Sequence, residues 1–85
     1  MYIVDIKKKA QRELLALPKK DQLRVLGAME ILSKNPFVGK KLHGEYTGAW
    51  SLRVWPYRII YTIHQHIVTV TVVAIGHRQG VYKNS

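Results

Sequence analysis

The sequence predicts an α+β domain in which an antiparallel pair of helices packs on one face of a mainly antiparallel four-stranded sheet. Three observations predict it: a helical period of apolar residues near the amino terminus, a tight break between two helical segments, and three runs of strand-forming residues in the second half. The predicted element order is β-α-α-β-β-β. Because 85 residues provide one modest core, we expect residues 1–85 to form a single domain.

The amino-terminal elements are predicted from periodicity and from residues that end helices. Residues 2–5 alternate like a short strand, and residues 6–17 carry apolar side chains at positions 6, 10, 14 and 17, a helical period. Pro18 ends this helix and suits the first turn of the next, which is predicted to reach about Lys34 before Asn35 and Pro36 stop it. We expect the second helix to present one apolar stripe, formed by Leu23, Leu26, Met29 and Leu32.

The second half of the chain predicts three strands joined by short turns. Residues 50–54, 57–63 and 67–75 are rich in Val, Ile, Thr, Tyr and Trp, which suit a pleated, half-buried surface. A glycine-rich connector at residues 37–48 precedes them and is expected to touch the sheet around Leu42. A hairpin turn centred on Trp55 and Pro56 pairs residue 54 with 57, 53 with 58, 52 with 59 and 50 with 61.

This pairing assigns the two faces of the predicted sheet. The face expected to pack against the helices is apolar and aromatic, with Trp50, Leu52, Val54, Tyr57, Ile59 and Tyr61. The opposite face carries Arg53 directly across from Arg58, together with Ser51, Ile60 and Thr62. Like charges that face each other destabilise a sheet, and no acidic residue follows Glu45, so the arginine pair predicts a site for an external anion. A phosphate backbone is the obvious candidate.

The charge balance narrows the class of partner. Fourteen Lys and Arg residues against five Asp and Glu residues give a formal net charge of +9, which favours nucleic acid, an anionic membrane or an acidic partner. No apolar stretch of about 18 residues and no secretory signal pattern is present, so we expect no membrane partner and a cytoplasmic protein. The absence of cysteine excludes thiol catalysis and a Cys-ligated metal, and we expect neither a metal nor a cofactor.

Two sequence motifs carry a resemblance to a known family. The segment K-L-H-G-x-x-x-G-A-W-S-L-R-V-x-x-Y-R-I-I-Y and the later segment A-I-G-H-R-x-x-V-Y resemble the RelE/ParE superfamily of toxins from bacterial and archaeal toxin-antitoxin pairs. The resemblance covers nearly the whole chain, including its length, element order and basic balance. It implies a RelE-like fold, similar to that of small microbial ribonucleases.

The activity that the resemblance implies depends on the branch of the superfamily. RelE-like members cleave messenger RNA in the ribosomal A site, whereas ParE-like members inhibit DNA gyrase and lack nuclease activity. We favour a ribosome-dependent messenger RNA endonuclease that inhibits translation, with a gyrase inhibitor as the alternative. The expected partners are the ribosome, messenger RNA and a small acidic antitoxin that wraps around the toxin. A basic RNA-binding module without toxic activity is disfavoured, since neither a GXXG loop nor an aromatic-rich RNP strand is present.

The resemblance also assigns site residues. Arg58 matches the arginine of the family's Tyr-Arg strand, and Arg78 matches the arginine after the last strand. Tyr82 matches the carboxy-terminal tyrosine, at a shorter spacing from Arg78 than in the founding member. Arg53 stands where that member has the second of two strand lysines, while Ser51 replaces the first. This departure weakens a nuclease assignment, because that lysine is thought to help activate the attacking hydroxyl.

The implied chemistry is in-line attack of a ribose 2′-hydroxyl on the neighbouring phosphate. Arginine forks bind the charged phosphoryl oxygens at two points, but arginine stays protonated and is a poor base. The proton transfers therefore need another group or help from the ribosome. His77 is the histidine beside an arginine in this cluster and suits acid or base work, unless it only ends a strand. Tyr82 suits stacking on an unpaired base, or packing of the tail.

Overall fold

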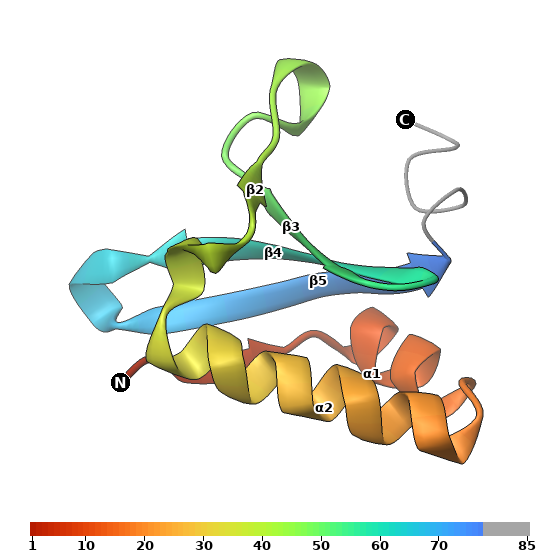
Figure 1. Ribbon diagram of the computed structural model, residues 1–85. Coiled ribbons are helices and arrows are strands. Elements are labelled where there is room, and N and C mark those ends of the chain that lie inside the picture. The colour runs from red at the N-terminus through yellow and green to blue at the C-terminus, as the bar shows by residue number, and fades with distance from the viewer. Residues whose placement is uncertain (78–85) are drawn as a thin grey trace.

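A mixed sheet of five strands carries both helices on one face (Figure 1). In the computed structural model, which describes residues 1–77, the strand order is β1-β5-β4-β3-β2. The α+β class and the order of the predicted elements are confirmed, and the sheet has one strand more than predicted. The elements are β1 (Ile3–Ile6), α1 (Lys8–Leu15), α2 (Lys19–Lys34), β2 (Lys40–Lys41), β3 (Trp50–Val54), β4 (Tyr57–His64) and β5 (Thr69–His77), with short 3-10 turns at Pro36–Val38, Gly44–Tyr46 and Gln65–Ile67.

The additional strand, β2, is short and lies at the edge of the sheet. Lys40 pairs with Ser51 and Lys41 pairs with Trp50, within the segment predicted to be a connector. Just beyond this ladder the Leu42 amide donates to the Ala49 carbonyl at 2.9 Å, where the connector was expected to touch the sheet. Two consecutive lysines have no strand propensity, so the sequence pattern gives no sign of this strand.

The first strand makes the sheet mixed, because β1 runs parallel to β5. Its ladder extends from Ile3 opposite Thr69 to Ile6 opposite Val72, and β5 continues beyond that point. There the Glu13 side chain of α1 accepts a hydrogen bond from the Ile75 amide at 2.8 Å. The carboxylate thus satisfies a backbone donor beyond the end of the β1 ladder and ties α1 to the sheet.

The β3–β4 hairpin has the predicted register. The cross-strand pairs are Val54 with Tyr57, Arg53 with Arg58, Leu52 with Ile59 and Trp50 with Tyr61. The next strand, β5, begins at Thr69 and not at position 67, because Gln65–Ile67 forms a 3-10 turn and Val68 adopts a left-handed conformation. The register of β4 against β5 shifts between Ile60 and Tyr61, which increases the local twist of the sheet.

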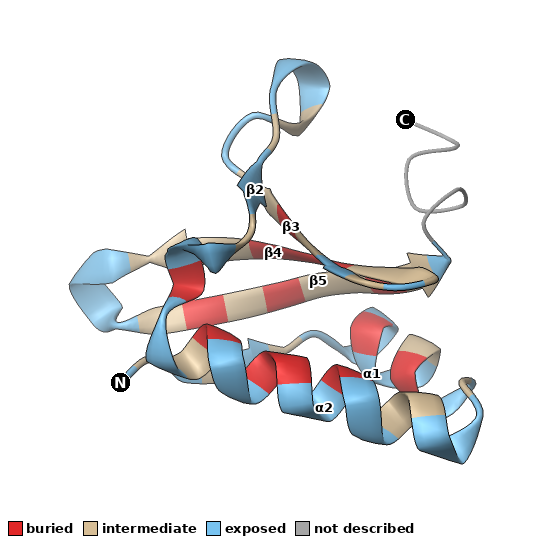
Figure 2. Cartoon of the chain, in the orientation of Figure 1, coloured by how far each residue is buried: buried red, intermediate tan, exposed pale blue. Residues whose placement is uncertain are grey.

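The core lies between the helices and the sheet (Figure 2). Its buried members are Ala10, Leu14, Val25, Ala28, Met29, Leu32, Ile59, Tyr61, Val70, Val72 and Ile75. The predicted stripe of α2 is wrong at two positions, since Leu23 and Leu26 are 61% and 44% exposed. This helix has apolar residues at two overlapping helical periods, and the period alone does not decide which one faces the sheet. Within residues 1–77, no helix has the length and apolar character needed to cross a membrane.

Tyr61 ties the connector to the sheet. Its buried hydroxyl donates to the Pro36 carbonyl at 2.8 Å and accepts from the Gly39 amide at 3.2 Å. Burial raises the pKa of Tyr61 above its ordinary value, which keeps the hydroxyl protonated and able to donate. A Cβ at Gly39 would overlap the Tyr61 hydroxyl and lie 2.8 Å from the Ser51 carbonyl oxygen. The connector therefore passes against the Tyr61 ring at a point where no side chain fits.

Gly39→Ala is expected to lower the free energy of unfolding by roughly 1–3 kcal/mol, because the methyl group must displace Tyr61 and the backbone of Ser51. Gly27→Ala is the matched control: an added Cβ there meets no atom within 4 Å, and in the middle of α2 it should raise stability by about 0.5–1 kcal/mol. Urea unfolding followed by circular dichroism measures both. Equal effects of the two substitutions would contradict the close approach at Gly39.

Candidate functional site

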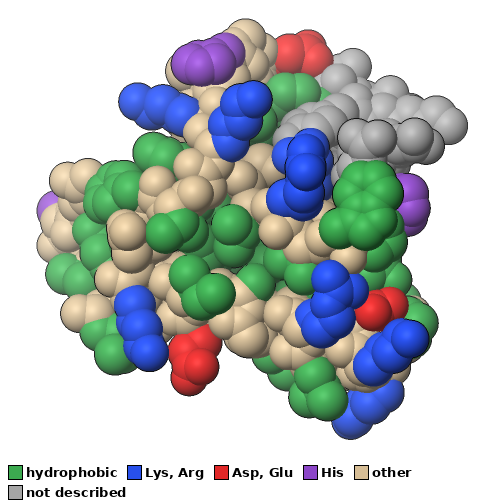
Figure 3. Space-filling view, in the orientation of Figure 1, with side chains coloured by type: hydrophobic (Ala, Val, Ile, Leu, Met, Phe, Trp, Pro, Cys, Tyr) green, Lys and Arg blue, Asp and Glu red, His purple; other side chains and the backbone are tan. Residues whose placement is uncertain are grey.

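The sheet face opposite the helices carries the predicted arginine pair. Arg53 and Arg58 are register partners on β3 and β4, with Arg53 exposed and Arg58 half-buried. A hollow of about 440 Å³, here called the arginine hollow, is lined by both arginines together with Gly39, Lys40 and Ser51. Figure 3 shows Lys and Arg side chains gathered close to β2 and the neighbouring strand β3. The hollow is therefore suited to an anion.

Ser51 fixes the orientation of Arg58. The serine is 2% exposed, and its hydroxyl accepts a hydrogen bond from Arg58 Nη1 at 3.2 Å. Ser51 is thus buried, although its face of the sheet was predicted to be open. A guanidinium that is oriented before a ligand binds loses less freedom on binding a phosphate, so the serine acts as a positioning residue.

The hairpin that carries the two arginines is fastened to α2. Arg24 Nη2 donates to the Trp55 carbonyl at 2.7 Å, and the Tyr57 hydroxyl donates to Asp21 Oδ2 at 2.8 Å. Asp21 also forms an ion pair with Arg24 at 3.4 Å. The hydrogen bond to Asp21 raises the pKa of Tyr57 above its ordinary value. Sequence reasoning missed these supports, because the contacts join residues that no motif or period relates.

His77 lies at the end of β5 in a different cross-strand row from the arginines. Its register partner is Tyr57, and the two rings meet edge-on with centroids 6.4 Å apart. The residue opposite Arg58 on β5 is Gly76. Since successive residues of a strand point to opposite faces, His77 belongs to the face of Tyr57, and the structure does not bring it together with the arginine pair. Its role as an acid or base stays a prediction.

Two of the predicted site residues, Arg78 and Tyr82, lie outside the described residues. Their roles also stay predictions. Among residues 1–77, no group of three or more His, Asp or Glu side chains is placed to hold a metal ion. The described part of the site therefore consists of cations and a serine hydroxyl, which can bind and orient a phosphate.

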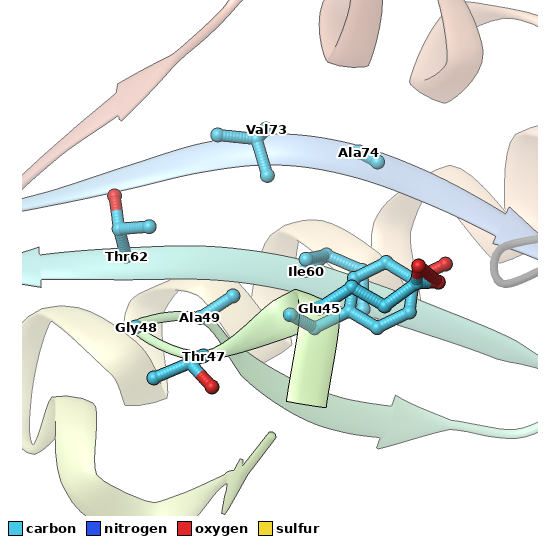
Figure 4. Close-up of a pocket in the computed structure, with 9 residues that line it drawn as sticks. Glu45, Thr47, Gly48, Ala49, Ile60, Thr62, Val73 and Ala74 are labelled. Atoms are coloured by element: carbon cyan, nitrogen blue, oxygen red, sulfur yellow. The ribbon is translucent and has the colours of Figure 1, made fainter. Parts of the chain in front are cut away.

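A second hollow lies on the same face of the sheet, and Figure 4 shows the residues that line it. It measures about 440 Å³ and lies between strands β4 and β5 and the connector segment 45–49. Ile60, at its base, is the register partner of Ser51, so the two hollows meet along the β3–β4 pair. The lining is mainly apolar, with Val73, Ala74 and Tyr46, and it also includes the carboxylate of Glu45. An apolar hollow beside a basic one can take the base and the phosphate of one nucleotide.

Comparison with known proteins identifies the same family along the chain. A family model described as "ParE toxin of type II toxin-antitoxin system, parDE" matches residues 4–82. Toxin RelG of Mycobacterium tuberculosis is 34% identical over 84 residues, which cover 96% of this chain and 97% of RelG. The two matches agree on the superfamily and carry the names of different branches.

Solved structures give the same result for the fold. The RelBE2 toxin-antitoxin complex of Mycobacterium tuberculosis contains a chain that superposes with a TM-score of 0.84 at 35% identity, covering 91% of this chain and 98% of that one. The RelE-RelB complex of Pyrococcus horikoshii gives a TM-score of 0.80 at 27% identity, with 94% and 98% covered. The isolated RelE toxin of E. coli, at 20% identity, shares the fold with a TM-score of 0.79, and 91% and 84% are covered.

Inorganic phosphate is expected to raise the melting temperature of the protein more than sodium chloride at equal ionic strength, because an anion bound between Arg53 and Arg58 stabilises only the folded state. Arg53→Ala and Arg58→Ala should each lose at least about half of this increment. Arg12→Ala, a charge-matched change at an exposed position of α1, should keep it. Thermal unfolding followed by circular dichroism provides the comparison. The same increment in all three variants would mean that phosphate does not act at the arginine hollow.

Proposed function

This chain belongs to the RelE/ParE superfamily of toxins of type II toxin-antitoxin systems, and on that basis we propose that it is a ribosome-dependent messenger RNA endonuclease. The observation that carries the proposal is the cross-strand pair of Arg53 and Arg58, which lines a basic hollow beside an apolar one. This arrangement fits a single-stranded nucleotide chain, whose phosphates carry charge and whose bases present flat faces that stack on apolar surface. The matches from Mycobacterium tuberculosis carry Rel names, which supports the RelE-like branch.

In the proposed reaction, the 2′-oxygen of a ribose forms a bond to the adjacent phosphorus while the bond to the 5′-oxygen breaks. The 2′-hydroxyl loses a proton, and the 5′-oxygen takes one up. Arg58, oriented by Ser51, binds a phosphoryl oxygen, and Arg53 stabilises the negative charge that develops in the transition state. As the resemblance implies, Arg78 also binds the phosphate, and Tyr82 stacks on a base.

In the proposed mechanism, the ribosome contributes to proton transfer and to the positioning of the RNA. The side chains that line the arginine hollow include no carboxylate and no imidazole, and arginine does not act as a base at neutral pH. His77 lies on the other face of the strands and Glu45 lines the adjoining hollow, so we infer that ribosomal RNA contributes to the proton transfers and to the in-line geometry. The protein contributes the preorganised positive charge, and binding to the A site contributes proximity.

The alternative function is inhibition of DNA gyrase without nuclease activity. Two observations favour it: the matching family model is described as a ParE toxin, and the site has a serine at position 51. A basic face also suits a protein that acts on an enzyme bound to DNA. The two functions differ in whether any phosphodiester bond is broken, and this difference is measurable.

We also propose a cognate antitoxin as the physiological partner. The relatives from Mycobacterium tuberculosis and Pyrococcus horikoshii were solved as toxin-antitoxin complexes. On this chain, a net charge of +9 and exposed apolar side chains on α2, such as Leu23 and Leu26, fit an acidic, amphipathic segment that wraps around the toxin. Recovery of the tagged toxin from its native host as a monomer, with no small acidic protein bound, would contradict this partner.

Messenger RNA on a ribosome with an empty A site should be cut within the exposed codon, whereas free RNA should be cut poorly or not at all. Arg58→Ala should slow the cut by about 10²–10³-fold, the loss typical for one transition-state hydrogen-bond donor. Arg12→Ala is the charge-matched control and should cut at close to the wild-type rate. Primer extension on translating lysate measures cleavage, and a supercoiling assay on the same preparations measures gyrase.

The two assays separate the candidate functions. New codon-phased ends with unaffected supercoiling support the endonuclease. Inhibited supercoiling with intact messenger RNA would reject it in favour of the gyrase inhibitor. Circular dichroism melts of the variants establish that a lost activity does not come from unfolding.

A further inference from the structure

Two consecutive lysines of the edge strand β2 point to opposite faces of the sheet. Lys41 pairs with Trp50, and its Nζ lies over the indole ring at 5.9 Å from the centroid, on the side of the core. Lys40 pairs with Ser51 and lines the arginine hollow. Because successive strand residues alternate between faces, Lys40 shares the face of Arg53 and Arg58, while Lys41 does not.

The backbone that carries Lys40 is held on both sides. Before it, the Gly39 amide donates to the Tyr61 hydroxyl at 3.2 Å, and the missing side chain at Gly39 lets the connector lie against that ring. At Lys40 itself, the chain pairs with Ser51, the residue that orients Arg58. The lysine stem thus begins at a fixed point on the rim of the hollow, which reduces the freedom lost when the ammonium binds a ligand.

No acidic side chain neutralises Lys40 within the described part of the chain. Between pairs of described residues, ion pairs join Lys9 with Glu13 and Arg24 with Asp21, both on the helices. The Lys40 ammonium therefore adds a third positive charge to those of Arg53 and Arg58. Cations from three neighbouring strands thus line one hollow: Lys40 lies opposite Ser51, and the Arg53–Arg58 pair lies two residues further along the hairpin on the same face.

We propose that Lys40 is a third phosphate-binding residue of the arginine hollow and contacts the RNA backbone next to the phosphate held by the two arginines. That the ligand is RNA rests on the proposed function; Lys40 adds one more contact to its backbone. A compact ammonium with three donors suits a phosphate oxygen, and it complements the planar forks of the arginines. The other reading of Lys40 is that a lysine at a sheet edge only prevents pairing with another chain. Lys41 serves that purpose equally well, which makes it the matched control.

A binding experiment tests Lys40 independently of cleavage. The probe is a single-stranded RNA hexanucleotide with 2′-O-methyl groups, which cannot undergo the 2′-hydroxyl attack. The dependence of log Kobs on log salt should become less steep by about 0.7 in Lys40→Ala, the contribution of one phosphate contact on a single strand. Lys41→Ala should keep the wild-type slope. A wild-type slope in Lys40→Ala, or an equal loss in both variants, would overturn the inference.

A second measurement tests Lys40 in the reaction. In single-turnover cleavage on programmed ribosomes at saturating protein, Lys40→Ala should slow the cut roughly tenfold, as expected for one charge-assisted hydrogen bond. Lys40→Arg should recover most of the rate, and Lys41→Ala should stay within about twofold of wild type. If wild type cuts normally and Lys40→Ala matches Lys41→Ala, the inference fails and the endonuclease stands. If wild type does not cut but the salt slope depends on Lys40, the anion site stands and the endonuclease fails.

Discussion

The pairing of Arg53 with Arg58 places two like charges opposite each other on neighbouring strands, which destabilises a sheet by about 0.2–1 kcal/mol when no anion lies between them. The opposite face of the same hairpin offsets this cost. There Ile59 and Tyr61 are fully buried against the helices, and Arg24 and Tyr57 bind the turn to α2. Burial of apolar surface on one face thus allows the other face to hold repelling charges in fixed positions.

Fixed charge is what a phosphate-binding site requires, because donors that are already oriented need no reorganisation when the ligand arrives. Ser51 holds Arg58, the hairpin register holds Arg53 across from it, and the Tyr61–Gly39 contact holds the start of β2 beside them. The adjoining hollow over Ile60 adds apolar surface next to the charge. The described side chains that line the arginine hollow supply charge and orientation, and the carboxylate of Glu45 lies in the adjoining hollow.

The β3–β4 hairpin was predictable because the strand pattern and the turn residues indicate the same register. Strand-forming residues alternate with period two on both sides of Trp55 and Pro56, so the turn alone sets the register and places the arginines together. Other features depend on tertiary contacts that the sequence pattern does not show. Lys40 and Lys41 have no strand propensity, and they form β2 only because they pair with β3. Helix α2 has apolar residues on two neighbouring stripes, and its sequence does not show which stripe is buried. His77 was linked to the arginines by proximity in sequence, and the alternation of strand residues separates them.

A double-mutant cycle tests most directly whether an anion binds between Arg53 and Arg58. The free energy of unfolding in urea is measured for wild type, Arg53→Ala, Arg58→Ala and the double variant, at low salt and again in saturating phosphate. We expect the coupling energy between the two arginines to become more favourable by about 0.2–1 kcal/mol in phosphate than at low salt. The same coupling energy in both conditions would contradict an anion site between the arginines.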